Sequence, residues 1–155
     1  MAKRYWLMKS EPDVYSIDDL ARDGSTFWDG VRNYKARNNM RAMKVGDEVL
    51  YYHSNANPPG VVGIARVCRE AYPDPTQFDR KSKYFDEKSK KDDPRWSLVD
   101  IEFVAKLPSP VGLDDVKAEK ALADMELVRY GRLSVQSVTK EEFARVKRMG
   151  GAWDA

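Results

Sequence analysis

The sequence predicts an α+β fold in which a curled, mostly antiparallel sheet forms a small open β-barrel flanked by short helices. Segments rich in β-branched and aromatic residues recur along the chain, at 5–9, 48–53, 61–70, 97–107 and 132–138. Segments with helical spacing or capping residues lie between and after them, at 16–24, 33–44, 111–125 and 139–151. This irregular order is typical of α+β proteins. A length of 155 residues is typical of one domain, so we expect a single domain over residues 1–155.

The N-terminal elements have clear boundaries in the sequence. The aromatic segment 5–9 predicts a strand, and residues 16–24 predict a short helix. Ser16 is a favourable N-cap and Gly24 is a favourable terminator. The next predicted helix, at 33–44, carries two stripes, because residues three or four apart share a face. One stripe is apolar and contains Ala36, Met40 and Met43; the neighbouring stripe is basic and contains Arg37, Arg41 and Lys44.

The middle of the chain predicts a hairpin and a long excursion. Residues 48–53 and 61–70 are joined by a loop rich in Pro and Gly, which favours an antiparallel pair. Gly63, inside the second strand, permits a bulge or the close approach of a ligand. Residues 71–96 are polar and have little apolar pattern. A compact domain rarely contains so long a loop unless it serves as a lid or a binding arm.

The last third of the chain contains the clearest strand. Val99, Ile101 and Phe103 alternate with polar residues over 97–107. One or two short acidic helices follow at 111–125, then a strand at 132–138. The closing helix begins with a capping box, in which Thr139 is the N-cap and Glu142 occupies the third helical position.

Composition restricts the class of protein. With 42% hydrophobic and 34% charged residues, the chain has the balance of a globular domain rather than a disordered one. The single cysteine excludes an internal disulfide framework. No stretch has the apolar length of a membrane span or a signal peptide. Because the chain also starts almost at the domain boundary without a basic targeting tail, we expect a cytoplasmic protein of bacterial type with no membrane partner.

Several kinds of catalytic site are disfavoured by the sequence. His53 is the only histidine, and Ser54 beside it would point to the opposite face of a strand. A Cys68–His53 dyad remains conceivable, although a thiol in so apolar a strand is more often buried and inert. The sequence contains neither G-x-x-x-x-G-K nor G-x-G-x-x-G, the glycine motifs that bind the phosphates of nucleotides. A single histidine does not support a metal site. Acid–base chemistry by carboxylate pairs stays open, but we expect no enzyme, no cofactor and no metal.

The remaining feature is a combination of aromatic and basic residues around Trp28. The net charge is only +2, but residues 29–44 carry five basic side chains against Asp29 alone, and uneven charge favours a local anionic partner. The amides of Val31 to Tyr34 are predicted as free donors at the start of the helix. An indole beside free donors suits an unstacked nucleobase. The side chains expected to contact phosphate are Lys35, Arg37 and Arg41. The alternatives are that Trp28 belongs to the core and that the basic stripe is only a solvated face.

Six blocks of the sequence, in order, resemble the EVE domain, a PUA-like family. The blocks are "YWLMKSEP" at 5–12, "WDGVRNYKARNNMR" at 28–41, "KVGDEVLYYHSN" at 44–55, "GVVGIARV" at 60–67, "DPRWSLVD" at 93–100 and "RLSVQSV" at 132–138. They cover nearly the whole chain. The family is similar to YTH domains, which hold a methylated adenine in an aromatic cage. The resemblance implies a PUA-like β-barrel and a pocket for a modified base, with modified cytosine in DNA as the usual proposal.

The resemblance also implies which residues surround that pocket. Trp28 would be one wall. Lys9 and Ser10 would lie at its rim, and Val31, Arg32, Asn33 and Tyr34 at the start of the helix would contact the base. His53 and Ser54 would lie at the end of the neighbouring strand. The far side would be closed by Trp96, Arg132, Leu133 and Ser134.

The sequence therefore predicts a non-enzymatic reader of modified bases in DNA or RNA, acting as a monomer. One alternative is an enzyme that processes nucleosides or RNA, or an accessory protein of RNA modification. Another is a protein-interaction module that uses the acidic segment 113–126.

Overall fold

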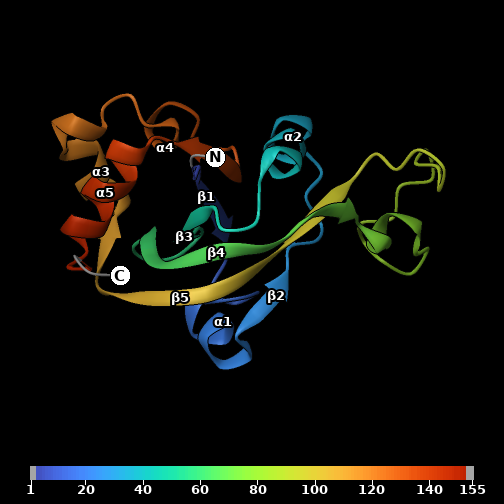
Figure 1. The fold of residues 1–155 in the computed structure, drawn as a ribbon, viewed down its shortest axis with the longest axis horizontal. Helices are drawn as coiled ribbons and strands as arrows, with labels where there is room; N and C mark the ends of the chain where they lie inside the picture. Colours follow the sequence, from blue (N-terminus) through green and yellow to red (C-terminus); the bar gives the residue numbers. More distant parts are fainter. Residues whose placement is uncertain (1–2, 153–155) are drawn as a thin grey trace.

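The computed structural model describes residues 3–152, which form a six-stranded mixed sheet with five α-helices around it (Figure 1). The hydrogen-bonded order is β2-β5-β4-β3-β1-β6. β1 and β3 are parallel, and the other neighbours are antiparallel. The strands are β1 (Tyr5–Ser10), β2 (Ser25–Phe27), β3 (Glu48–His53), β4 (Gly60–Pro73), β5 (Ser97–Gly112) and β6 (Val135–Val138). The α+β class is confirmed, whereas the domain range 1–155 stays a prediction that extends beyond the described residues at both ends.

The predicted barrel is not confirmed, because the sheet is open in the described part of the chain. Its two edge strands, β2 and β6, have only three and four residues. Each pairs with one neighbour, β5 or β1, and they lie at opposite ends of the order. Because β2 and β6 do not pair with each other, the described sheet has two free edges.

The helices follow the capping residues seen in the sequence. The α-helices are α1 (Ile17–Asp23), α2 (Tyr34–Ala42), α3 (Leu113–Ala118), α4 (Glu126–Arg129) and α5 (Lys140–Met149), and two 3₁₀ turns, η1 (Pro75–Phe78) and η2 (Lys120–Leu122), accompany them. Ser16 caps α1, and the box between Thr139 and Glu142 caps α5 as predicted. No helix among residues 3–152 combines the length and apolarity needed to traverse a lipid bilayer.

The core consists of two clusters of buried side chains. Trp6, Met8 and Tyr51 belong to one cluster, together with buried residues of α1 and α2, and we call it the α1–α2 cluster. Leu7 belongs to the other, which includes Phe143 of α5 and which we call the α5 cluster. Because neighbouring residues of β1 join different clusters, this strand is buried on both faces.

The strands β4 and β5 are longer than predicted, and their pairing carries the excursion that connects them. β4 continues to Pro73 and β5 to Gly112, with several register shifts between them. Residues 74–96 project beyond the far ends of this pair (Figure 1). β2 was not predicted, because its three residues show no apolar alternation and only Thr26 is half-buried. The predicted irregularity at Gly63 is confirmed, but a Cβ there would collide with Ile17, so the close neighbour is a core side chain.

Candidate nucleic-acid interface

A cavity of about 820 Å³ lies where the end of β1 meets the loop between β2 and α2. Its other walls come from the excursion and from the loop before β6. Eight of the predicted pocket residues line it, namely Lys9, Ser10, Trp28, Val31, Arg32, Ser54, Arg132 and Ser134. Five do not, namely Asn33, Tyr34, His53, Trp96 and Leu133. The cavity therefore gathers most of the predicted residues from four separate segments of the chain.

Trp28 is both a core residue and a wall of the cavity. Its exposure is 9%, and its ring meets Tyr51 edge to face at 5.5 Å within the α1–α2 cluster. Its backbone amide donates a hydrogen bond to the carbonyl of Val99 at 2.8 Å. The indole is therefore fixed from behind and presents only a small part of its surface to the cavity. Phe27, the preceding residue, also lines the cavity and is 58% exposed, so it is the aromatic side chain most available to a ligand.

The loop after Trp28 is held by the fully buried carboxylate of Asp74. Asp74 Oδ2 accepts hydrogen bonds from the Gly30 amide at 2.8 Å and from Arg32 Nη1 at 3.1 Å. Its Oδ1 accepts from the amide and the hydroxyl of Thr76. All its acceptors therefore serve to join the loop to the start of the excursion.

Arg32 and Gly30 complete this connection through Tyr84. The guanidinium of Arg32 donates to the Tyr84 carbonyl from Nη2 at 2.8 Å and from Nε at 3.2 Å, and to Thr76 Oγ1 at 3.0 Å. Gly30 has φ +78°, and a Cβ there would lie 2.6 Å from the Tyr84 ring. Glycine is needed at this position for its conformation and for the approach of the ring. Arg32 thus fixes the shape of the cavity wall rather than standing free as a base contact.

Asp29 is a carboxylate in the cavity wall that sequence reasoning did not place there. Burial raises its pKa, and the nearby charge of Asp74 raises it further, while a hydrogen bond from its own backbone amide and the charges of Arg32 and Lys83 partly oppose the change. Lys83 and Tyr84 bring the excursion to the same cavity. The sequence predicted a lid or a binding arm at 71–96 but did not single out these two residues, because the segment shows no periodicity that would place them.

Lys9 joins the end of β1 to the loop before β6. Its Nζ donates to the Gly131 carbonyl at 2.5 Å and lies 5.4 Å from the centre of the Tyr52 ring. Burial lowers the pKa of this amine. In the adjoining loop, Arg132 is exposed and lines the cavity, but Leu133 is 8% exposed and packs in the α1–α2 cluster. The predicted pocket role of Leu133 is therefore replaced by a core role.

The other four residues outside the cavity lining have structural partners. Asn33 caps α2 by accepting from the Ala36 amide at 2.9 Å. His53 Nε2 accepts from the Ile17 amide at 3.1 Å, and burial lowers the pKa of this imidazole, which keeps that nitrogen unprotonated. Tyr34 stacks on Trp96 with ring centres 5.0 Å apart, and the Trp96 indole donates to Asp86. This stack supports the excursion from outside the cavity.

The predicted basic stripe has a partly structural role. Arg37 Nη1 donates to the Arg95 carbonyl at 3.0 Å, and Arg41 Nη2 donates to the carbonyls of Pro94 and Arg95. These bonds hold α2 against the segment that enters β5. Lys35 is exposed and lies 4.4 Å from the Tyr130 ring centre. The helix itself begins at Tyr34, so the amides of Val31, Arg32 and Asn33 precede it and are not its N-terminal donors.

The arrangement offers little to the catalytic schemes considered from the sequence. The β3–β4 register pairs His53 with Gly60 and Glu48 with Arg66, so Cys68 lies beyond the opposite end of β3. Burial raises the pKa of the Cys68 thiol, which disfavours the thiolate. Within residues 3–152 no three His, Cys, Asp or Glu side chains form a group suited to a metal ion. The absence of enzymatic activity itself stays a prediction.

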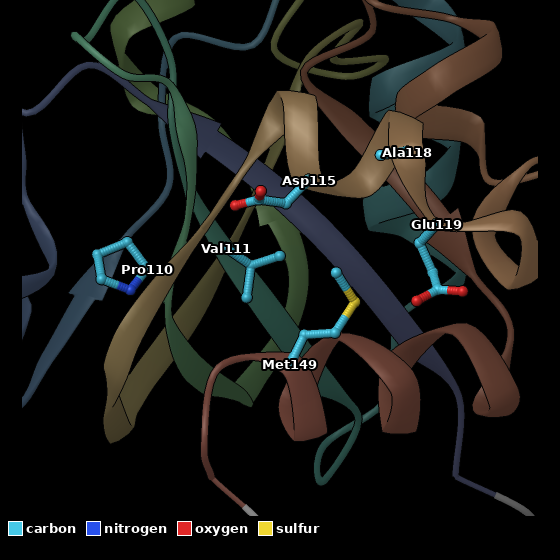
Figure 2. Close-up of a pocket in the computed structure, with 6 residues that line it drawn as sticks. All are labelled: Pro110, Val111, Asp115, Ala118, Glu119 and Met149. Atoms are coloured by element: carbon cyan, nitrogen blue, oxygen red, sulfur yellow. The ribbon is translucent and has the colours of Figure 1, made fainter.

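A second cavity, of about 360 Å³, lies between the end of β5, α3 and α5 (Figure 2). Val111 and Met149, which line it, belong to or pack against the α5 cluster, not the cluster of Trp28. Its acidic side chains are engaged locally. Asp115 accepts from the Gly112 amide at 3.1 Å, and Glu119 pairs with Arg145 at 3.1 Å. The acidic segment here therefore stabilises its own helix start and its contact with α5.

The fold and the cavity define an α+β protein with a partly buried aromatic and basic pocket at one end of an open mixed sheet. Residues 4–149 match the model of the EVE domain, and the chain belongs to the EVE domain family. This confirms the family inferred from the six sequence blocks.

The relatives of the chain include animal proteins and solved structures. It is 46% identical to mouse "Thymocyte nuclear protein 1" over 158 residues, which cover 90% of this chain and 70% of that protein. It is similar to a protein from Leishmania major, with TM-score 0.93, 49% identity and coverage of 99% of this chain and 98% of that one. It is also similar to human THYN1 protein in complex with DNA that contains 5-methylcytosine, with TM-score 0.92, 41% identity and coverage of 96% and 98%. The names of the animal relatives place those proteins in the nucleus, and a cytoplasmic location for this chain remains a prediction.

Proposed function

We propose that this chain is a non-enzymatic nucleic-acid-binding protein that holds one flipped or single-stranded modified base, such as a modified cytosine, in the Trp28 cavity. The observation that carries the proposal is the cavity of about 820 Å³ with Phe27 exposed and Trp28 fixed in its wall. A base has to leave its stack to enter such a space. Stacking on an aromatic side chain contributes about 1–3 kcal/mol per base. The human THYN1 structure with 5-methylcytosine DNA supports this class of ligand.

Basic side chains around the cavity are the proposed contacts to the sugar–phosphate chain. Lys83 and Arg132 line the cavity and are exposed, and Lys35 is exposed at the start of α2. Arg37 and Arg41 already donate to carbonyls, so in this proposal they act mainly through their charge. Such contacts are expected to give binding that weakens as salt concentration rises.

The test compares Phe27→Ala with a matched phenylalanine outside the cavity. Fluorescence anisotropy would measure binding to a single-stranded oligonucleotide with one 5-methylcytosine and to the same strand with cytosine. Wild type is expected to prefer the methylated strand about fourfold, since one buried methyl group contributes about 0.8 kcal/mol. Phe27→Ala should weaken binding about tenfold through lost stacking. Phe85→Ala, 37% exposed and outside the lining, should bind as wild type.

Equal binding by all three proteins would overturn the proposal, and so would a wild type with no preference for the methylated strand. Trp28→Ala is a poor test, because truncation of a buried tryptophan is expected to cost about 3–5 kcal/mol of folding stability. Mass spectrometry of the recovered strand adds a check on the enzyme alternative, since a reader leaves the mass of the strand unchanged.

A further inference from the structure

We propose that Asp29 determines which base the cavity accepts, by accepting a hydrogen bond from an exocyclic amino group. The inference rests on the proposed function and narrows it to an amino-bearing, cytosine-type base rather than a thymine-type base of the same shape. Asp29 follows Trp28 and precedes Gly30 in the sequence, and all three residues line the cavity. Its position beside a fixed aromatic wall suits contact with the edge of a base.

The neighbouring carboxylate cannot serve this purpose. Asp74 is fully buried and uses both oxygens for Gly30, Arg32 and Thr76. Asp29 is half-buried and faces the cavity instead. Its own backbone amide donates to it, but among the described residues no other residue does, and Arg32 and Lys83 act on it only through their charge. Asp29 therefore uses no acceptor for another residue, and most of its acceptor capacity remains available to a ligand.

The electrostatic setting of Asp29 supports a role in binding. Burial and the charge of Asp74 both raise its pKa, so the ionised side chain is disfavoured in the empty protein. An amino group that donates to this carboxylate would compensate for part of the lost hydration. A purely structural aspartate would instead be expected to have donors from other residues, as Asp74 has from Gly30 and Arg32.

The chemistry of the base edge makes the inference selective. Cytosine presents a donating amino group at position 4, where thymine presents an accepting carbonyl. A carboxylate accepts from the first and repels the second. 5-Methylcytosine and thymine carry the same methyl group at position 5, so stacking and methyl burial do not distinguish them. Discrimination between these two bases therefore reports on the edge contact.

The test uses two single-stranded oligonucleotides that differ at one position, 5-methylcytosine in one and thymine in the other. Wild type is expected to bind the first about tenfold more tightly, the effect of one good edge contact. Asp29→Asn should reduce this ratio to about twofold or less, because an amide both donates and accepts. Asp13→Asn removes the same charge from an exposed site outside the cavity lining and should keep the wild-type ratio.

The outcomes separate this inference from the function on which it rests. If wild type prefers 5-methylcytosine over cytosine but Asp29→Asn keeps the tenfold ratio against thymine, the role of Asp29 is refuted and the reader function stands. If wild type does not distinguish 5-methylcytosine from cytosine or from thymine, both are refuted. Thermal melting of each variant confirms that a changed ratio does not come from unfolding.

Discussion

Removal of the Asp74 carboxylate is expected to destabilise the protein strongly and to loosen the cavity wall. In Asp74→Ala four hydrogen bonds disappear, and the charge of Arg32, whose side chain is 22% exposed, loses its carboxylate partner. Breaking a buried ion pair by removing one partner typically costs about 3–5 kcal/mol. Because water still reaches part of Arg32, we expect about 3 kcal/mol. In a chain of this length that corresponds to a fall in Tm of about 10 °C.

Thermal unfolding followed by circular dichroism measures this change, with Asp79→Ala as the control. Asp79 is an exposed residue that accepts from the Lys81 amide in a nearby turn, and its loss should change the Tm by about 2 °C or less. Arg32→Ala combined with Asp74→Ala should cost clearly less than the sum of the two single changes, because the double variant leaves no unpaired charge. Additive costs, or a fall for Asp74→Ala no larger than for Asp79→Ala, would refute the reasoning.

Two further predictions concern carboxylates elsewhere in the fold. Asp47→Ala should lower the free energy of unfolding, measured by urea titration, by about 2–4 kcal/mol. Asp47 is 3% exposed and accepts hydrogen bonds from the amides of Arg4 and Lys44 and from Trp6 Nε1, so its removal leaves buried donors unpaired. A loss below about 0.5 kcal/mol would contradict this reasoning. Asp29→Asn should raise the free energy of unfolding at neutral pH, because the charged carboxylate of the wild type is unfavourable in the folded state. This gain should fade as pH falls through the raised pKa of Asp29, because the folded wild type is then protonated as well. The charged groups acting on Asp29 are Asp74, Arg32 and Lys83, so a gain that is the same at every pH would point to another cause.

The sequence predicted those parts of the fold that depend on local chemistry. Caps such as Ser16 and Thr139 act over three residues, and the apolar alternation of β5 follows from side chains that point to alternate faces of one strand. Both features could therefore be predicted from the sequence. β2 was not, because its pairing with β5 depends on residues more than 70 positions away in the chain. The open sheet was also beyond local patterns, since closure depends on how edge strands of three and four residues meet their neighbours.

The sequence predicted most of the residues that the structure gathers around the cavity, but fewer of their contacts. The aromatic and basic character of 28–41 drew attention to a segment of which Trp28, Val31 and Arg32 line the cavity, and its role in binding stays a prediction. The roles of Arg32 and Arg37 were misjudged, because their partners, the carbonyls of Tyr84 and Arg95, lie more than 50 residues further along the chain. Phe27 was missed for the same reason, since only the pairing of β2 shows that it is exposed beside the cavity.

The position of Trp28 before the basic helix can be explained by two nearby carboxylates, those of Asp74 and Asp29. Asp74 fixes the loop through Gly30 and Arg32, which allows the indole of Trp28 to be held by the core and still border a cavity. Burial and the same fixed charge raise the pKa of Asp29, which lines that cavity. A structural carboxylate beside a second carboxylate that has no donor from another described residue is unfavourable for stability alone, and such local conflicts are expected where a protein binds a ligand. The loop is thus fixed where it joins the excursion, and under our proposal a base with an amino group would supply the donor that Asp29 does not receive from other residues.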